Sequence, residues 1–223
     1  MTDRPILFST PMIRALLAGR KTQTRWILKP QPIGFDWFDL KCTPRIKIGD
    51  RLWVREAHFL TDDGDGDGEY AVYVAEGNDA TGEHLHEVAA LEKLHPTVDW
   101  SKHKKQRPSI HMRRWASRLT LIVTDVRVEQ LKDISLEDAE SEGLFSWKYT
   151  DCDGDPRLDG QPYETTAWDW KPPIHEYGGH HSPVQAYRDL WEYINGPGSW
   201  EASPWVAAYT FTVIKQNIDE VGR

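Results

Sequence analysis

The sequence predicts an α+β fold in which short strands form a small β-barrel flanked by about three helices. Segments of alternating apolar and polar residues, typical of half-buried strands, are interleaved with three segments of helical periodicity. The regular alternation of strand and long helix that builds a parallel sheet is absent, which favours α+β over α/β. At 223 residues, one domain spanning 1–223 with two insertions is the expected organisation.

Three helices are predicted from residues that favour helix ends. Each begins at a hydroxyl-bearing N-cap residue and stops at a glycine. The N-cap and stop residues are Thr10 and Gly19 for the first helix, Ser135 and Gly143 for the second, and Ser182 and Gly196 for the third. In the second helix Asp138 is expected to complete a capping box, and Glu142 falls in the last turn, where the helix dipole disfavours a carboxylate.

Strands are predicted where apolar and polar residues alternate. The main candidates are 51–55, 119–131 and 205–214, with a shorter one at 70–74. Two intervening stretches, 57–107 and 145–180, are polar and low in hydrophobic periodicity, and we predict that both are insertions. Residues 20–25, just after the first helix, are predicted to form a turn.

The overall charge argues against a protein that coats nucleic acid. The formal net charge is -8, whereas nonspecific nucleic-acid affinity rests on neutralising phosphates with Lys and Arg. A small neutral ligand fits this balance better. One basic stretch without Asp or Glu is nevertheless present, with Lys102, Lys104, Lys105, Arg107, Arg113, Arg114 and Arg118.

Hydropathy and cysteine content indicate a soluble, cytoplasmic protein without a metal site. No apolar run approaches the roughly 18 residues that cross a membrane. Cys42 and Cys152 form no C-x-x-C pair, so neither a disulfide framework nor a zinc site is indicated. The acidic repeat at 63–68 imitates the start of a calcium loop, but Val74 stands where the bidentate Glu belongs. We therefore predict an acidic turn there, with no metal and no cofactor.

The segment after the first helix combines an amine with a hydroxyl. Lys21 and Thr24 lie between Arg20 and Arg25. A lysine becomes a base when burial or a neighbouring cation lowers its pKa from about 10.4, and a hydroxyl beside such a base can act as a nucleophile. On a regular strand Lys21 and Thr24 would point to opposite faces, so this chemistry requires a turn or bulge after Gly19. The alternative is a solvated turn without chemistry.

Three segments, in the same order, resemble the motif series of the ASCH family of the PUA-like superfamily. They are LAGRKTQTR at 17–25, GDRLWVRE at 49–56 and ISLEDAESEG at 134–143. The resemblance implies a PUA-like β-barrel and covers about half of the chain, without the two insertions. The full pattern is also similar to longer ASCH proteins encoded by phages and prophages.

The first segment resembles the bacterial amidohydrolases of this family that act on N4-acetylcytidine. The resemblance implies Lys21 as the base, Thr24 as the nucleophile and Glu142 as the proton donor, with Glu56 as the rival for the last role. Cleavage of an exocyclic amide, here to cytidine and a carboxylic acid, needs one residue of each kind. Residues expected around the modified nucleoside are Arg20, Arg25, Trp53, Glu56 and Trp115, the tryptophans as stacking surfaces.

Two other functions stay open. PUA-like barrels are commonly RNA readers, so the main alternative is an RNA-binding module, with or without ribonuclease activity. The basic stretch supports this alternative, and the overall acidity opposes it. The third hypothesis is a noncatalytic interaction protein carried by a phage.

Overall fold

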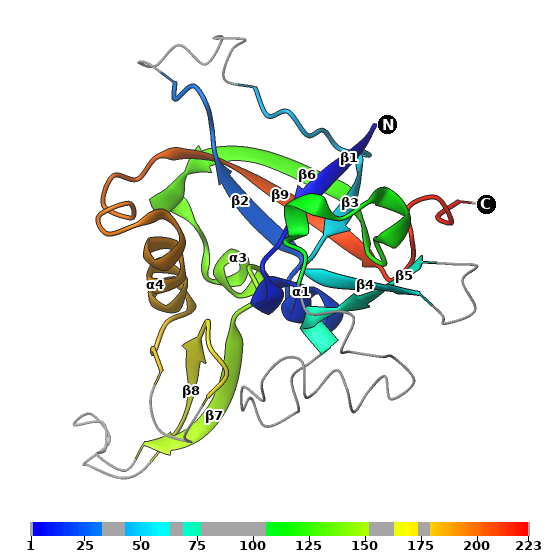
Figure 1. Cartoon of the computed structure of the whole chain (residues 1–223). Coiled ribbons are helices and arrows are strands. Elements are labelled where there is room, and N and C mark those ends of the chain that lie inside the picture. Colours follow the sequence, from blue (N-terminus) through cyan, green and yellow to red (C-terminus); the bar gives the residue numbers. More distant parts are fainter. Residues whose placement is uncertain are drawn as a thin grey trace. The chain divides into compact units, whose positions relative to one another are not determined.

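The computed structural model describes residues 2–32, 43–62, 69–76, 106–151, 163–173 and 179–222, and shows an α+β fold (Figure 1). Most of its elements are strands, and its α-helices are α1 (Thr10–Leu17), α3 (Leu136–Ser141) and α4 (Pro183–Asn195). The predicted α+β class is therefore confirmed. None of the helices in these ranges is both long and apolar enough to cross a membrane.

Five strands form the main sheet, in the order β1-β3-β6-β9-β2. Their bounds are Asp3–Leu7 for β1, Gln23–Ile27 for β2, Arg51–Arg55 for β3, Thr120–Gln130 for β6 and Trp205–Ile214 for β9. β1 runs parallel to β3, whereas β3 is antiparallel to β6 and β2 is antiparallel to β9. This order ends at β1 and β2, so closure into a barrel is not seen among the described strands and stays a prediction.

The structure corrects the prediction for the segment after the first helix. Residues 20–25 do not remain in a turn, because the chain enters β2 at Gln23. The buried side chains at the start of β2 are Gln23, Thr24 and Arg25, which are all polar. The apolar alternation that reveals a strand in a sequence is therefore missing from β2.

The described residues group into two compact units. The first consists of Met1–Gly19, Ile46–Asp125 and Phe211–Arg223, and the second of Arg20–Arg45 and Val126–Thr210. Strands β6 and β9 each contribute residues to both units. This division into two units does not test the single domain expected from the sequence, which stays a prediction.

The first unit contains a hairpin within the stretch predicted as an insertion. Strands β4 (His58–Asp62) and β5 (Glu69–Tyr73) pair antiparallel, and Phe59, Val72 and Val74 form a small buried cluster. The strand predicted at 70–74 corresponds to β5, whereas β4 was not predicted. Residues 63–68 and 77–105 lie outside the described part of the chain.

The second unit is built around α3, α4 and a second hairpin. Ala139 of α3 packs with Ala186, Tyr187 and Trp191 of α4 in one buried cluster. β7 (Phe145–Asp151) and β8 (Tyr163–Asp169) pair antiparallel along their whole length. The stretch 145–180, predicted as a polar insertion, therefore contains two regular strands.

The helix ends follow the predicted residues with two differences. The N-cap of α1 is Ser9 instead of Thr10. Ser135 caps α3 as predicted, since its Oγ accepts from the Asp138 N–H at 3.1 Å. The Asp138 carboxylate does not complete a capping box, because it accepts hydrogen bonds from arginine and glutamine side chains of the second unit.

Candidate active site

Two glycines shape the segments that carry Lys21 and Glu142. Gly19 has a positive φ of 75°, which ends α1 and lets the chain continue in extended form. Gly143, with a φ of 101°, likewise ends α3 directly after its C-cap residue Glu142. Lys21 and Glu142 then pair in an isolated β-bridge, which joins the start of β2 to the end of α3.

The side chains of Lys21 and Glu142 form a buried ion pair. Lys21 Nζ donates to Glu142 Oε2 at 2.9 Å and to the Glu142 carbonyl oxygen at 3.0 Å. The two residues are only 0% and 5% exposed. A buried charge requires such a partner, and the ammonium also offsets the unfavourable carboxylate at the helix C-terminus.

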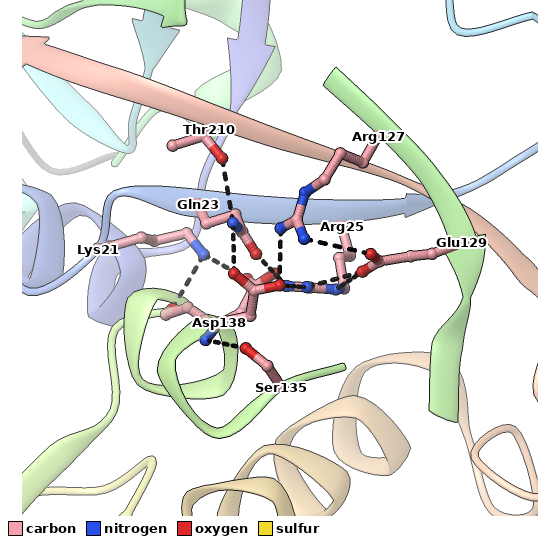
Figure 2. A network of polar contacts seen from close by, with 9 residues as sticks. Lys21, Gln23, Arg25, Arg127, Glu129, Ser135, Asp138 and Thr210 are labelled. Atoms are coloured by element: carbon pink, nitrogen blue, oxygen red, sulfur yellow. Dashed lines mark hydrogen bonds and ion pairs between the residues drawn. The ribbon is translucent and has the colours of Figure 1, made fainter. Parts of the chain in front are cut away.

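Arg25 holds the other oxygen of the Glu142 carboxylate. Its Nη1 donates to Glu142 Oε1 at 3.0 Å. Its Nη2 donates to Asp138 Oδ2 at 2.8 Å and its Nε to Glu129 Oε1 at 2.9 Å (Figure 2). Burial opposes the charge on this guanidinium, but Glu142 and Glu129 outweigh burial and raise the pKa of Arg25 above its ordinary value. Arg25, expected as a substrate-binding residue, is instead placed to position Glu142.

Gln23 and Arg127 complete the network around Arg25. Gln23 Nε2 donates to Asp138 Oδ1 at 3.0 Å, and its Oε1 accepts from Arg25 Nη1. Arg127 Nη2 donates to Asp138 Oδ2 at 2.6 Å. Burial alone would raise the pKa of Asp138, but the hydrogen bonds from Arg127 and Gln23 bring it below its ordinary value. Cations and carboxylates are balanced in this network, which contains Lys21, Arg25, Arg127, Glu129, Asp138 and Glu142.

Tyr187 of α4 contacts the same carboxylate. Burial raises the pKa of Tyr187 well above its ordinary value, and Glu142 acts in the same direction, in part through a hydrogen bond with the phenol. Because the phenol keeps its proton, it is the donor in this bond. Glu142 therefore accepts from Lys21, Arg25 and Tyr187, which together fix the orientation of its carboxylate.

Thr24 lies on the other face of β2. This strand is regular from Gln23 to Ile27, and Thr24 is opposite Tyr209 of β9. Because neighbouring side chains of a strand alternate, Thr24 points away from the face that Gln23 and Arg25 share. Lys21 precedes β2 and lies in an isolated bridge with Glu142, after the positive-φ turn at Gly19. The juxtaposition of the Lys21 and Thr24 side chains stays a prediction.

The remaining residues expected around a substrate are distributed over both units. Arg20, in the second unit, is half-buried with its guanidinium carbon 4.0 Å from the centre of the Phe145 ring. Trp53, in the first unit, is half-buried, and the Arg55 guanidinium carbon lies 5.2 Å from its ring centre. Trp115, also in the first unit, is 45% exposed.

Glu56, the rival proton donor, is paired with an arginine. Arg118 Nε and Nη2 donate to its two carboxylate oxygens at 2.9 and 3.0 Å. Burial raises the pKa of Glu56, although Arg118 opposes the shift. Glu56 thus has its own cation in the first unit, while Glu142 is the carboxylate that pairs with Lys21.

Two arginines of the basic stretch that supports RNA binding form ion pairs with carboxylates of the first unit. Arg114 forms ion pairs with Asp3 at 2.6 Å and Asp219 at 2.7 Å, and Arg118 is bound by Glu56. Such pairs leave less positive charge for phosphates. The lysines of the stretch lie outside the described residues, at Lys102, Lys104 and Lys105.

Acid–base chemistry is what the described arrangement offers most directly. A lysine and a glutamate in contact can exchange a proton, which yields an amine as base and a carboxylic acid as donor. No group of three or more His, Cys, Asp or Glu side chains in the described ranges is arranged to hold a metal ion. The acidic repeat at 63–68 and both cysteines, Cys42 and Cys152, fall outside these ranges.

The sequence analysis missed several members of the network. The available signal was the period-two spacing of Lys21, Gln23 and Arg25, which places three polar side chains on one face of a strand. Their carboxylate partners lie 104 to 121 residues away in the chain, so local patterns do not reveal them. Comparison of the chain with protein-family models, with curated proteins and with solved structures gave no match in any of the three.

Proposed function

We propose that this protein is an ASCH amidohydrolase with a PUA-like barrel, which cleaves the N4-acyl amide of acylated cytosine nucleosides. The observation that carries the proposal is the contact of 2.9 Å between Lys21 Nζ and Glu142 Oε2. These are the residues to which the family resemblance assigns the base and the acid. Their partnership within a buried, charge-balanced network favours a built site over a solvated turn.

The proposed reaction uses the neutral form of the pair. Transfer of a proton from Lys21 Nζ to Glu142 gives a free amine and a carboxylic acid. The amine takes the proton of the nucleophile as it attacks the acyl carbon, and Glu142 gives its proton to N4 as the C–N bond breaks. Cytidine leaves, and water releases the acyl group as a carboxylic acid.

The nucleophile proposed from the resemblance is Thr24. Thr24 is buried in β2, three residues after Lys21, and the proposal requires its hydroxyl to lie within reach of the Lys21 amine when substrate binds. With Thr24 as nucleophile, Thr24→Ala loses turnover and Thr24→Ser keeps part of it, because serine retains the hydroxyl. Mass spectrometry of the quenched reaction should then show an acyl ester on Thr24. Full activity of Thr24→Ala would instead assign the attack to a water molecule.

The proposed activity is tested by incubating the purified protein with N4-acetylcytidine and following the ultraviolet absorbance of the base. We expect conversion to cytidine with one equivalent of acetate. The same assay with other N4-acyl groups defines the acyl preference. An inert protein across this series would contradict the amidohydrolase proposal and would favour an RNA-binding module.

A further inference from the structure

Arg20, beside the candidate site, is one of the arginines for which the described residues provide no carboxylate partner. Ion pairs with Asp or Glu engage Arg25, Arg51, Arg114, Arg118 and Arg127. Within the described residues no carboxylate pairs with Arg20, and its buried Nε has no hydrogen-bond partner there. Burial also lowers the pKa of Arg20. A half-buried cation without a counter-charge is unfavourable, and a bound anion would offset this cost.

Phe145 supports the guanidinium of Arg20. The guanidinium carbon lies 4.0 Å from the ring centre, in a cation–π contact. A cation–π contact uses the π face of the ring and does not occupy the N–H donors of the guanidinium. Phe145 thus helps to hold Arg20 in place, and the two Nη groups are the donors that would make a planar, two-pronged contact with an oxyanion.

Covalent geometry keeps Arg20 close to the Lys21–Glu142 pair. Arg20 directly precedes Lys21, with about 3.8 Å between the two Cα atoms, and Phe145 is the third residue after Glu142. Neighbouring side chains of an extended chain point to opposite sides. Arg20 accordingly contacts Phe145, whereas Lys21 contacts Glu142. The two cations diverge from adjacent positions of the same segment.

We infer that Arg20 binds a phosphate group of the substrate, so that the site acts on a nucleotide in preference to a neutral nucleoside. This inference rests on the proposed amidohydrolase function. In an N4-acylated cytidine monophosphate the acyl group and the phosphate stand at opposite ends of the molecule. Because the side chains of Lys21 and Arg20 diverge, Lys21 can reach the acyl end while Arg20 binds the phosphate. A single arginine in a chain of net charge -8 fits one phosphate better than a long nucleic acid.

Binding is measured first, because it does not depend on turnover. In calorimetric titrations of the full chain, cytidine 5′-monophosphate is expected to bind about tenfold more tightly than cytidine. Arg20→Gln should abolish this preference, and Arg20→Lys should keep part of it, since lysine retains the charge without the two-pronged geometry. Arg188→Gln removes the same charge from an exposed position on α4 and should change nothing.

Several outcomes would overturn the inference. Equal binding of nucleotide and nucleoside would do so, as would a preference that survives in Arg20→Gln when circular dichroism shows the variant folded. A third titration uses a short cytidine-containing oligoribonucleotide. If only this oligonucleotide binds in an Arg20-dependent way, the phosphate belongs to RNA and the mononucleotide is excluded.

Turnover then separates this inference from the proposed function. We expect kcat/KM for N4-acetylcytidine 5′-monophosphate to exceed that for N4-acetylcytidine by about tenfold, and Arg20→Gln to remove the difference. Turnover of both substrates at equal kcat/KM would contradict the role of Arg20 and leave the amidohydrolase proposal standing. Arg20-dependent binding without turnover of either substrate would contradict the amidohydrolase and support the phosphate site.

Discussion

Arg25→Met is expected to lower the free energy of unfolding by about 3–5 kcal/mol, the size typical of removing one member of a buried ion pair. The Arg25 side chain is 0% exposed and is in contact with Glu129, Asp138 and Glu142. Methionine has a similar length but no charge, so these carboxylates lose their shared cation. The cost arises from the charges left behind more than from the lost attraction.

Arg127→Met provides the matched control for Arg25→Met. Arg127 contacts Asp138 in the same network, but its side chain is 42% exposed. Exposed pairs contribute little, so the expected loss is below about 1 kcal/mol. Urea unfolding followed by circular dichroism gives the free energy of unfolding of both variants. The two values can be compared directly if this free energy depends on urea concentration as steeply in the variants as in the parent protein. Similar small losses for both would show that Arg25 is not the centre of the network.

Lys21→Met and Glu142→Gln are each expected to reduce turnover of N4-acetylcytidine by about 10²–10⁴-fold, the usual contribution of general acid or base catalysis. Lys21→Met removes the base, while Arg25 still holds Glu142. Glu142→Gln keeps the shape of the side chain and its capacity to hydrogen-bond, but removes the proton that N4 would receive. Initial rates at saturating substrate report the loss in kcat directly.

The double variant Lys21→Met/Glu142→Gln distinguishes a catalytic pair from a structural one. Each single variant leaves one buried charge without its partner and therefore also loses stability, whereas the double variant removes both charges together. We expect its free energy of unfolding to recover relative to the single variants and its turnover to stay lost. Recovery of turnover together with stability would mean that the pair only supports the fold.

Elements with strong local patterns are the part of the fold that the sequence predicts well. β3, β6 and β9 alternate apolar and polar residues, and their predicted ranges agree closely with the structure. Glycine stops mark the ends of α1 and α3 correctly, since Gly19 and Gly143 both have positive φ. In β2 the buried face is polar, and no pattern of hydrophobicity distinguishes such a strand from a loop.

The candidate site could be predicted only in part. The family resemblance singled out Lys21 and Glu142, and the structure places them in contact. It also suggested Arg25 as a ligand-binding residue, but a sequence does not show that a guanidinium will be surrounded by carboxylates from distant segments. The position of Thr24 follows from the alternation of β2, which was not predicted as a strand.

The pairing of β2 has a consequence for how the protein is made. β2 lies at the end of the sheet order and pairs with β9, so that Gln23 stands opposite Thr210. During synthesis on the ribosome, β2 can pair only after its partner strand has been made, because Gln23 and Thr210 are 187 residues apart in the chain. Such nonlocal pairing slows folding. A nascent chain that stops before 205 lacks the strand that pairs with β2, even though Glu142, the partner of Lys21, has already been made.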